Sequence, residues 1–320
     1  MASPFATRYN HPMNTSAIKQ SMGLAEWAML ITLSMIWGGS FFFNRIAVSE
    51  LPVFTIVALR VGIAACILWL IVLATRTPLP GDRKTYQRLF LLGFINSVIP
   101  FSLIVWGQTR IGSGPASILN ATTPFFTIIV ANAFLADERL TWQKFTGVII
   151  GIAGVAAMIG VSAFEDAAAD VIAELALIGA SIAYALGTTF ARQFRSHPPL
   201  IVATGQITSA ALIITPIAII ADQAWTLPLP RTEVMLSVAS LAALCTAFAY
   251  LLYFRILRSA GATNVALVTF LVPVSAILLG ILFLGEHLEW RHLTGMAAIS
   301  AGLALIDGRL IRRFTNRAAA

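Results

Sequence analysis

The sequence predicts an all-α integral membrane protein whose ten transmembrane helices form two inverted five-helix repeats. Three observations lead to this fold class. Of the 320 residues, 58% are hydrophobic and 11% are charged, compared with about 45–50% and about 25% in soluble domains. Apolar runs of about 20 residues, the length that crosses a bilayer, follow one another along the chain. The second half of the chain also repeats a residue pattern of the first half.

The predicted spans are separated by short polar segments rich in Pro, Gly and charged residues, which are typical of turns. They cover residues 24–46, 53–74, 89–109, 115–135, 144–162, 171–191, 200–220, 234–254, 263–284 and 292–308. The first repeat then occupies residues 24–162 and the second residues 171–308, between a tail at 1–23 and a basic tail at 309–320. No connection between spans is long enough for a soluble domain.

The distribution of positive charge predicts the orientation of the chain. The net charge is +7, but the interleaved basic and aromatic surface typical of nucleic-acid binding is missing, so no nucleic-acid partner is expected. With the amino terminus inside, sixteen of the 21 Lys and Arg residues fall on the inner side, as the positive-inside rule requires. Both termini are therefore expected in the cytoplasm of a multi-pass protein of the plasma (bacterial inner) membrane.

An internal repeat relates the two halves. Pro124 matches Pro273 at a spacing of 149 residues, and Trp142 matches Trp290 at a spacing of 148. Further upstream, Trp37 corresponds to Tyr184 at a spacing of 147. Because each unit has an odd number of helices, the second unit must enter the membrane upside down. Inverted repeats of this kind are typical of secondary transporters, whose substrate site lies near the midplane between the halves.

Several motifs within this repeat are shared with one known family. They are Trp37-Gly38-Gly39-Ser40-Phe41, Leu59-Arg60, the proline-centred fourth and ninth helices, and the Glu-x-Leu-x-Trp segments at 138–142 and 286–290. On these residues the chain resembles the drug/metabolite transporter superfamily, in its EamA-like branch, over about residues 24–308. The resemblance implies ten helices with both termini cytoplasmic. It also implies movement of small metabolites, amino acids or drugs, often outward.

Arg60 lies within the second predicted span, about eight residues from its outer end. A charge near the middle of the bilayer is unfavourable by about 2.5–3.5 kcal/mol on the insertion scale, so this side chain should face protein or water. It either binds a substrate carboxylate through its planar guanidinium or is structural, satisfied by helix-end carbonyls or by Glu50. The structural interpretation is preferred, because this arginine looks like a feature of the whole family.

Candidate cavity residues combine aromatic rings with a few polar groups. Trp37, Phe41 and Asn44 lie on one helical face, and Tyr184 with Thr188 repeats this arrangement. Such a face either lines a small-molecule cavity or packs against another helix. Further substrate-binding candidates inside the predicted spans are Asn96, Trp106, Asn120, Tyr250 and Thr269.

Two prolines are expected to bend their helices near the midplane. Pro124 and Pro273 each remove a backbone hydrogen bond in mid-helix, and Thr122, Thr123 or Thr269 can partly compensate the freed carbonyls. The sequence does not distinguish a hinge from a static kink.

No catalytic, metal or cofactor site is expected. His287 and His292 are five residues apart, so on a helix their rings diverge, and the matching segment of the first half contains no histidine. The sequence thus predicts a monomeric secondary transporter, an exporter of small solutes, that needs a bilayer and a small-molecule substrate. A membrane sensor or channel, and an intramembrane enzyme, are the alternatives.

Overall fold

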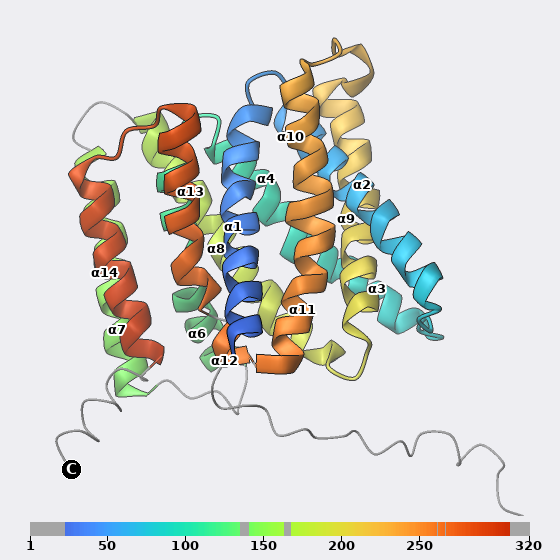
Figure 1. Cartoon of the computed structure of the whole chain (residues 1–320), viewed down its shortest axis with the longest axis horizontal. Coiled ribbons are helices and arrows are strands. Elements are labelled where there is room, and N and C mark those ends of the chain that lie inside the picture. The colour runs from blue at the N-terminus through green and yellow to red at the C-terminus, as the bar shows by residue number, and fades with distance from the viewer. Residues whose placement is uncertain (1–22, 135–140, 163–167, 261, 266, 308–320) are drawn as a thin grey trace, which may run out of the picture.

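The computed structural model describes residues 23–134, 141–162, 168–260, 262–265 and 267–307, and shows a bundle of helices (Figure 1). Nearly all of the two predicted tails, and Glu138 of the first Glu-x-Leu-x-Trp segment, lie outside the described residues. The helices are α1 (Leu24–Ala47), α2 (Val53–Thr75), α3 (Arg83–Gly93), α4 (Ile99–Gly107), α5 (Ser113–Asn120), α6 (Thr123–Phe134), α7 (Trp142–Ser162), α8 (Ala168–Ala191), α9 (Pro199–Asp222), α10 (Thr232–Ala242), α11 (Ala249–Ala260), α12 (Ala262–Val265), α13 (Val268–Leu284) and α14 (Trp290–Asp307).

These helices make up the ten predicted spans, because four spans are divided into two helices each. A π-helical turn, η1 (Phe94–Val98), joins α3 to α4, and another, η4 (Ala243–Phe248), joins α10 to α11. Short breaks separate α5 from α6 and α12 from α13. Short 3-10 turns, η2 (Arg192–Phe194) and η3 (Ala224–Thr226), follow α8 and α9. The predicted all-α membrane fold is therefore confirmed.

Length and composition distinguish the membrane-crossing elements. Among the described residues, seven helical segments are long and apolar enough to cross a membrane, and Trp142–Met158 and Val268–Leu284 are shorter apolar helices. Large aliphatic side chains such as Leu70, Leu212 and Leu282 are exposed on the surface of the bundle. A helix satisfies its own backbone hydrogen bonds, so an apolar outer surface of this kind suits a lipid environment.

The packing of the helices follows the inverted repeat. Equivalent helices of the two units pair with one another, since α2 packs along α9 and α7 along α14. The contact of α1 with α13 is matched by that of α8 with α6, which is the same pair with the units exchanged. Figure 1 shows the α7–α14 pair at one edge of the bundle and the α2–α9 pair on the opposite side. The two units are therefore related by an approximate two-fold axis.

The third span begins earlier than predicted. Helix α3 starts at Arg83, six residues before the predicted start at residue 89. Asp82 caps this helix, because its carboxylate accepts hydrogen bonds from the Thr85 backbone N–H at 2.7 Å and from the Thr85 hydroxyl at 2.9 Å. A cap of this kind stabilises a helix start whose residues are polar, where the hydropathy of the sequence gives no signal.

The two prolines behave differently. Helix α5 ends at Asn120 and α6 begins at Thr123, so the fourth span is interrupted directly before Pro124. The Thr123 hydroxyl donates to the Asn120 carbonyl at 2.7 Å, which compensates the bond that Pro124 cannot make. Pro273, in contrast, lies inside helix α13, which begins at Val268 and continues through the proline to Leu284.

Candidate functional site

Arg60 lies deep in the bundle, seven residues after the start of α2, which is roughly 10 Å along the helix. Its side chain is 5% exposed. The Nε group donates a hydrogen bond to the Thr246 hydroxyl at 2.9 Å, and the guanidinium carbon lies 4.0 Å from the centroid of the Phe101 ring. The prediction that Glu50 pairs with Arg60 is wrong, because Glu50 binds Arg231 instead. The predicted helix-end carbonyls are also not its partners, since within the described residues Arg60 makes no other hydrogen bond.

Gln206 of α9 forms a second polar centre. Its amide Nε2 donates to the Ser97 hydroxyl at 3.1 Å and to the Tyr250 hydroxyl at 2.8 Å. Its Oε1 accepts a hydrogen bond from Asn96 Nδ2 at 3.2 Å. Gln206 is 4% exposed, so these contacts satisfy an amide that would be unfavourable in an apolar helix interior.

The two polar centres are related by the approximate two-fold axis. Ser97 and Thr246 are equivalent at the 149-residue spacing, as are Phe101 and Tyr250. Arg60 of α2 donates to the Thr246 hydroxyl of η4 and lies over the Phe101 ring of α4. Gln206 of α9 donates to the Ser97 hydroxyl of η1 and to the Tyr250 hydroxyl of α11. We call these residues, together with Asn96, the central network. Each unit contributes equivalent residues to the central network.

Both π-helical turns lie within the central network. A π-turn shifts the backbone pairing by one residue, and such turns occur frequently at functional sites. In η4 the Thr246 hydroxyl donates to the Leu241 carbonyl at 2.8 Å, which leaves its oxygen directed at Arg60 Nε. The π-turn therefore positions the hydroxyl that holds the arginine.

An aromatic group adjoins the central network. The Tyr184 ring lies 6.4 Å from that of Phe101, and the Trp37 ring lies 5.8 Å from that of Tyr253. Phe254 connects Tyr253 with Tyr250 at centroid distances of 5.3 and 6.1 Å. Four of the predicted candidates, Arg60, Asn96, Tyr184 and Tyr250, are thus in or beside the network, and Trp37 is linked to it through aromatic contacts.

Asn44 and Phe41 belong to a different cluster, near the end of α1. Asn44 Nδ2 donates to Gln108 Oε1 at 3.2 Å, and Gln108 Nε2 donates to the Phe41 carbonyl at 2.8 Å. Arg45 donates to the Gln108 carbonyl at 2.8 Å and lines a surface cavity of about 630 Å³. The other lining residues are Ile46, Val48, Ser49, Thr109, Leu284, Gly285 and Glu286.

Three of the remaining candidates, Trp106, Thr188 and Asn120, make no contact with the central network in the described structure. Trp106 and Thr188 have exposed side chains. Asn120 lies at the end of α5, where its Oδ1 is buried and unpaired, and Thr269 is partly buried in α13. Sequence reasoning missed Gln206, Ser97 and Phe101. A single amide within the apolar run of α9 was the available signal for Gln206.

Three contacts close the end of the bundle that carries the cavity, which we call the Glu286 end and which is uppermost in Figure 1. Glu286 follows α13 and accepts hydrogen bonds from the Ser113 N–H, the Ser113 hydroxyl and the Gly114 N–H at 2.7, 2.8 and 3.1 Å. Asp222 at the end of α9 accepts from the N–H and the hydroxyl of Thr55 at 2.7 and 2.9 Å. Carboxylates at helix starts are favourable because they pair with free N–H groups.

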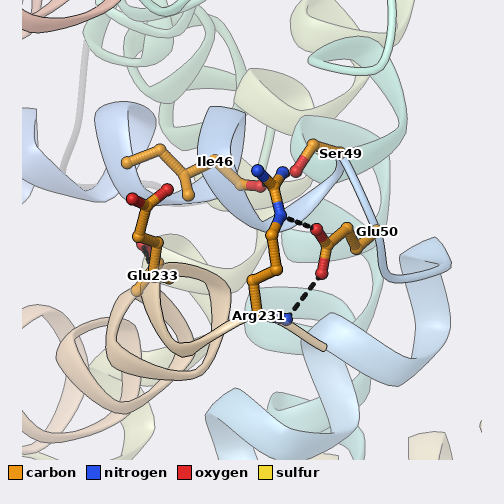
Figure 2. Close-up of polar contacts among 6 residues, drawn as sticks. Ile46, Ser49, Glu50, Arg231 and Glu233 are labelled. Carbon is orange, nitrogen blue, oxygen red and sulfur yellow. Dashed lines mark hydrogen bonds and ion pairs between the residues drawn. The ribbon is translucent and has the colours of Figure 1, made fainter. Parts of the chain in front are cut away.

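The third contact joins the loops between α1 and α2 and between α9 and α10 (Figure 2). Glu50 accepts a hydrogen bond from the Arg231 backbone N–H at 2.8 Å and forms an ion pair with the Arg231 side chain. The backbone N–H and the guanidinium of Arg231 hold the pKa of the Glu50 carboxyl below its usual value. The pair is solvent-exposed and therefore contributes little to stability. Figure 2 shows the guanidinium directed toward Ile46 and Ser49.

Within the described residues, no group of three or more His, Cys, Asp or Glu side chains could hold a metal ion. His292 has a local role, because its Nδ1 accepts a hydrogen bond from the Glu289 backbone N–H at 3.1 Å, at the start of α14.

Comparison with known proteins gives consistent results. A transporter of Archaeoglobus fulgidus, named uncharacterized, is 24% identical over 287 residues, covering 88% of this chain and 99% of that protein. The inner membrane transporter YedA of Escherichia coli, also named uncharacterized, is 24% identical over 84% of this chain and 87% of its own length. A crystal structure with 18% identity has a TM-score of 0.62 over 88% of this chain and 96% of its own, which shows a shared fold.

A family model described as the EamA-like transporter family matches residues 25–160 and again residues 171–307. The two matches together cover most of the chain, and the helices described above lie almost entirely within them. The chain therefore belongs to the EamA-like transporter family.

Proposed function

We propose that this membrane transporter is a secondary transporter that moves a small solute by alternating access between its two inverted units. The central network carries this proposal, because both units contribute equivalent hydroxyl and aromatic groups to one buried polar region. A site that is made symmetrically by two inverted units can open to either side of the membrane through equivalent movements.

The contacts at the Glu286 end fit this mechanism. In the described conformation, Glu286, Asp222 and Glu50 each join elements that are distant in sequence. Alternating access requires that contacts of this kind form in one state and break in the other. The open surface cavity beside Arg45 and Glu286 lies at this end and is proposed as the mouth on this side.

The solute is proposed to be a small metabolite, amino acid or drug, and the direction outward, as the family resemblance implies. The alternatives are a channel or sensor and an intramembrane enzyme. A channel would give flux that does not saturate, a sensor would bind without flux, and an enzyme would alter the solute. One flux measurement therefore separates them.

The proposal is tested by uptake of labelled metabolites and amino acids into proteoliposomes. We expect saturable uptake that falls at least about tenfold in Trp37→Ala, because a ring that contacts Tyr253 beside the network is lost. Trp225→Ala, which removes an exposed ring at the Glu286 end, is the matched control and should transport normally. Uptake measured with and without an imposed proton gradient shows whether transport is coupled to protons. Flux that rises linearly with concentration in every variant would contradict alternating access.

The orientation is proposed to place both termini, and therefore the loop between α2 and α3, in the cytoplasm. Cysteines introduced as Ser49→Cys and Gly81→Cys, in a Cys66→Ser background, lie in exposed segments at opposite ends of the bundle. Cys245 is 2% exposed and can remain. A membrane-impermeant maleimide added to intact cells should label Ser49→Cys but not Gly81→Cys. The reverse pattern would show the opposite orientation.

A further inference from the structure

Arg60 is a buried cation whose charge the protein leaves uncompensated. Within the part of the chain that the structure describes, no carboxylate forms an ion pair with Arg60, and its Nη nitrogens have no hydrogen-bond partner. The Thr246 hydroxyl is neutral and the Phe101 ring contributes a cation–π contact, so neither supplies a full negative charge. A charge in such a position marks a functional site whose partner should be identified.

The geometry of the guanidinium restricts the partner. Because Nε is used by Thr246 and one face lies over Phe101, the edge formed by the two Nη groups is the part left free. Two parallel N–H donors of this kind match the two oxygens of a carboxylate. Among side chains, arginine is the one that makes this bidentate contact, whereas lysine presents only a point charge.

The surroundings of Arg60 indicate what accompanies the anionic group. Tyr184 and Tyr250 lie close enough to contribute to its electrostatic environment, and Phe101 and Tyr184 form an aromatic pair beside it. The aromatic side chains beside Arg60 therefore suit a solute with an apolar or aromatic body.

We propose that Arg60 is the receptor for the carboxylate of the transported solute, which makes the substrate a small organic anion or zwitterion with an apolar body. This inference rests on the proposed transport function. It places the solute between the two π-helical turns, with its carboxylate on the Nη edge of Arg60 and its body against Phe101 and Tyr184.

The first test needs no ligand. Replacing an uncompensated buried charge by an apolar side chain of similar length removes its desolvation cost, so Arg60→Met should unfold in detergent at the wild-type temperature or above it, while transport is lost. Trp37→Ala serves as a control for loss of transport without removal of the charge. A fall of several degrees in the unfolding midpoint of Arg60→Met would show that Arg60 is structural and would overturn the proposal.

The second test compares solutes that differ only in the charge. Phenylpropionate and hexanoate, each with its amide, are titrated against the full-length protein while the unfolding midpoint is measured. We expect the carboxylates to raise the midpoint at concentrations about tenfold or more below those of the amides, because charge-assisted hydrogen bonds are stronger. Arg60→Gln should abolish the difference and Arg60→Lys should restore part of it. The matched control Arg110→Gln removes an exposed arginine and should leave the difference intact.

Flux of the same compounds into proteoliposomes separates this inference from the proposed function. Carboxylate flux that is lost in Arg60→Gln supports both. After subtraction of flux into protein-free liposomes, amides that cross as fast as carboxylates, or carboxylate flux that persists in Arg60→Gln, would overturn the carboxylate receptor and leave transport intact. Carboxylates that bind through Arg60 but never cross would support the receptor and contradict transport. Equal midpoints for carboxylates and amides in the wild type would overturn the receptor.

Discussion

Gly38→Ala is expected to lower the stability of the protein by roughly 1–2 kcal/mol, although alanine is ordinarily the better helix former. A Cβ atom at Gly38 would lie 2.0 Å from the Ser275 hydroxyl, 2.8 Å from the Val272 carbonyl and 2.9 Å from the Ala276 nitrogen. The hydroxyl can rotate away, but the two backbone atoms move only if α1 and α13 separate. The midpoint of thermal unfolding in detergent measures the effect.

The neighbouring glycine provides the matched control. A Cβ atom at Gly39 would meet nothing nearer than the Phe43 ring at 3.6 Å, which is ordinary contact. Gly39→Ala should therefore raise stability by about 0.5–1 kcal/mol through helix propensity alone. Two adjacent substitutions of the same type should shift the midpoint in opposite directions. Equal shifts would show that the close packing of α1 on α13 does not control stability.

Glu286→Ala is expected to lower stability by roughly 2–3 kcal/mol and to reduce transport, because three hydrogen bonds to a charged group are lost. Gly285 makes these bonds possible, since its backbone adopts φ +65° and turns the chain back toward α5. Without the carboxylate, the N–H groups of Ser113 and Gly114 lose their partner, and the contact between α5 and the segment after α13 is broken. Thermal unfolding and proteoliposome flux measure the two effects.

Glu289→Ala is the control for that prediction. Glu289 lies in the same segment, has an exposed side chain and pairs with the partly buried Arg291. Its removal should change stability by less than about 1 kcal/mol. If Glu286→Ala and Glu289→Ala have the same unfolding midpoint, the contact of Glu286 with α5 does not hold the Glu286 end closed.

The helices and their inverted arrangement could be predicted because both follow from local and repeated patterns. Apolar runs define the spans, and an odd number of helices per unit determines the inversion. The start of α3 was misplaced, since its first turns are polar and hydropathy does not report them. The cap formed by Asp82 and Thr85 was a readable signal that hydropathy alone overlooks.

The central network was only partly predictable. Arg60 and Tyr250 are conspicuous because polar groups within apolar spans are unfavourable unless they have a partner. Their partners are not visible in sequence, since Arg60 and Thr246 are 186 residues apart. The π-helical turns also escape prediction, because the segments Phe94–Val98 and Ala243–Phe248 have no composition that distinguishes them from α-helix. Packing between the two units determines both the partners of Arg60 and the positions of the π-helical turns.

The matched π-helical turns have a consequence for the ancestry of the protein. The turns η1 and η4 begin 149 residues apart, the same spacing that relates Pro124 to Pro273. π-turns are rare, and their occurrence at the same place in both halves is most simply inherited from a single five-helix precursor. Such a precursor would have paired with an oppositely oriented copy of itself. Arg60 and Gln206, which donate to the equivalent hydroxyls of Thr246 and Ser97 but differ in charge, mark a point at which the two halves have become different.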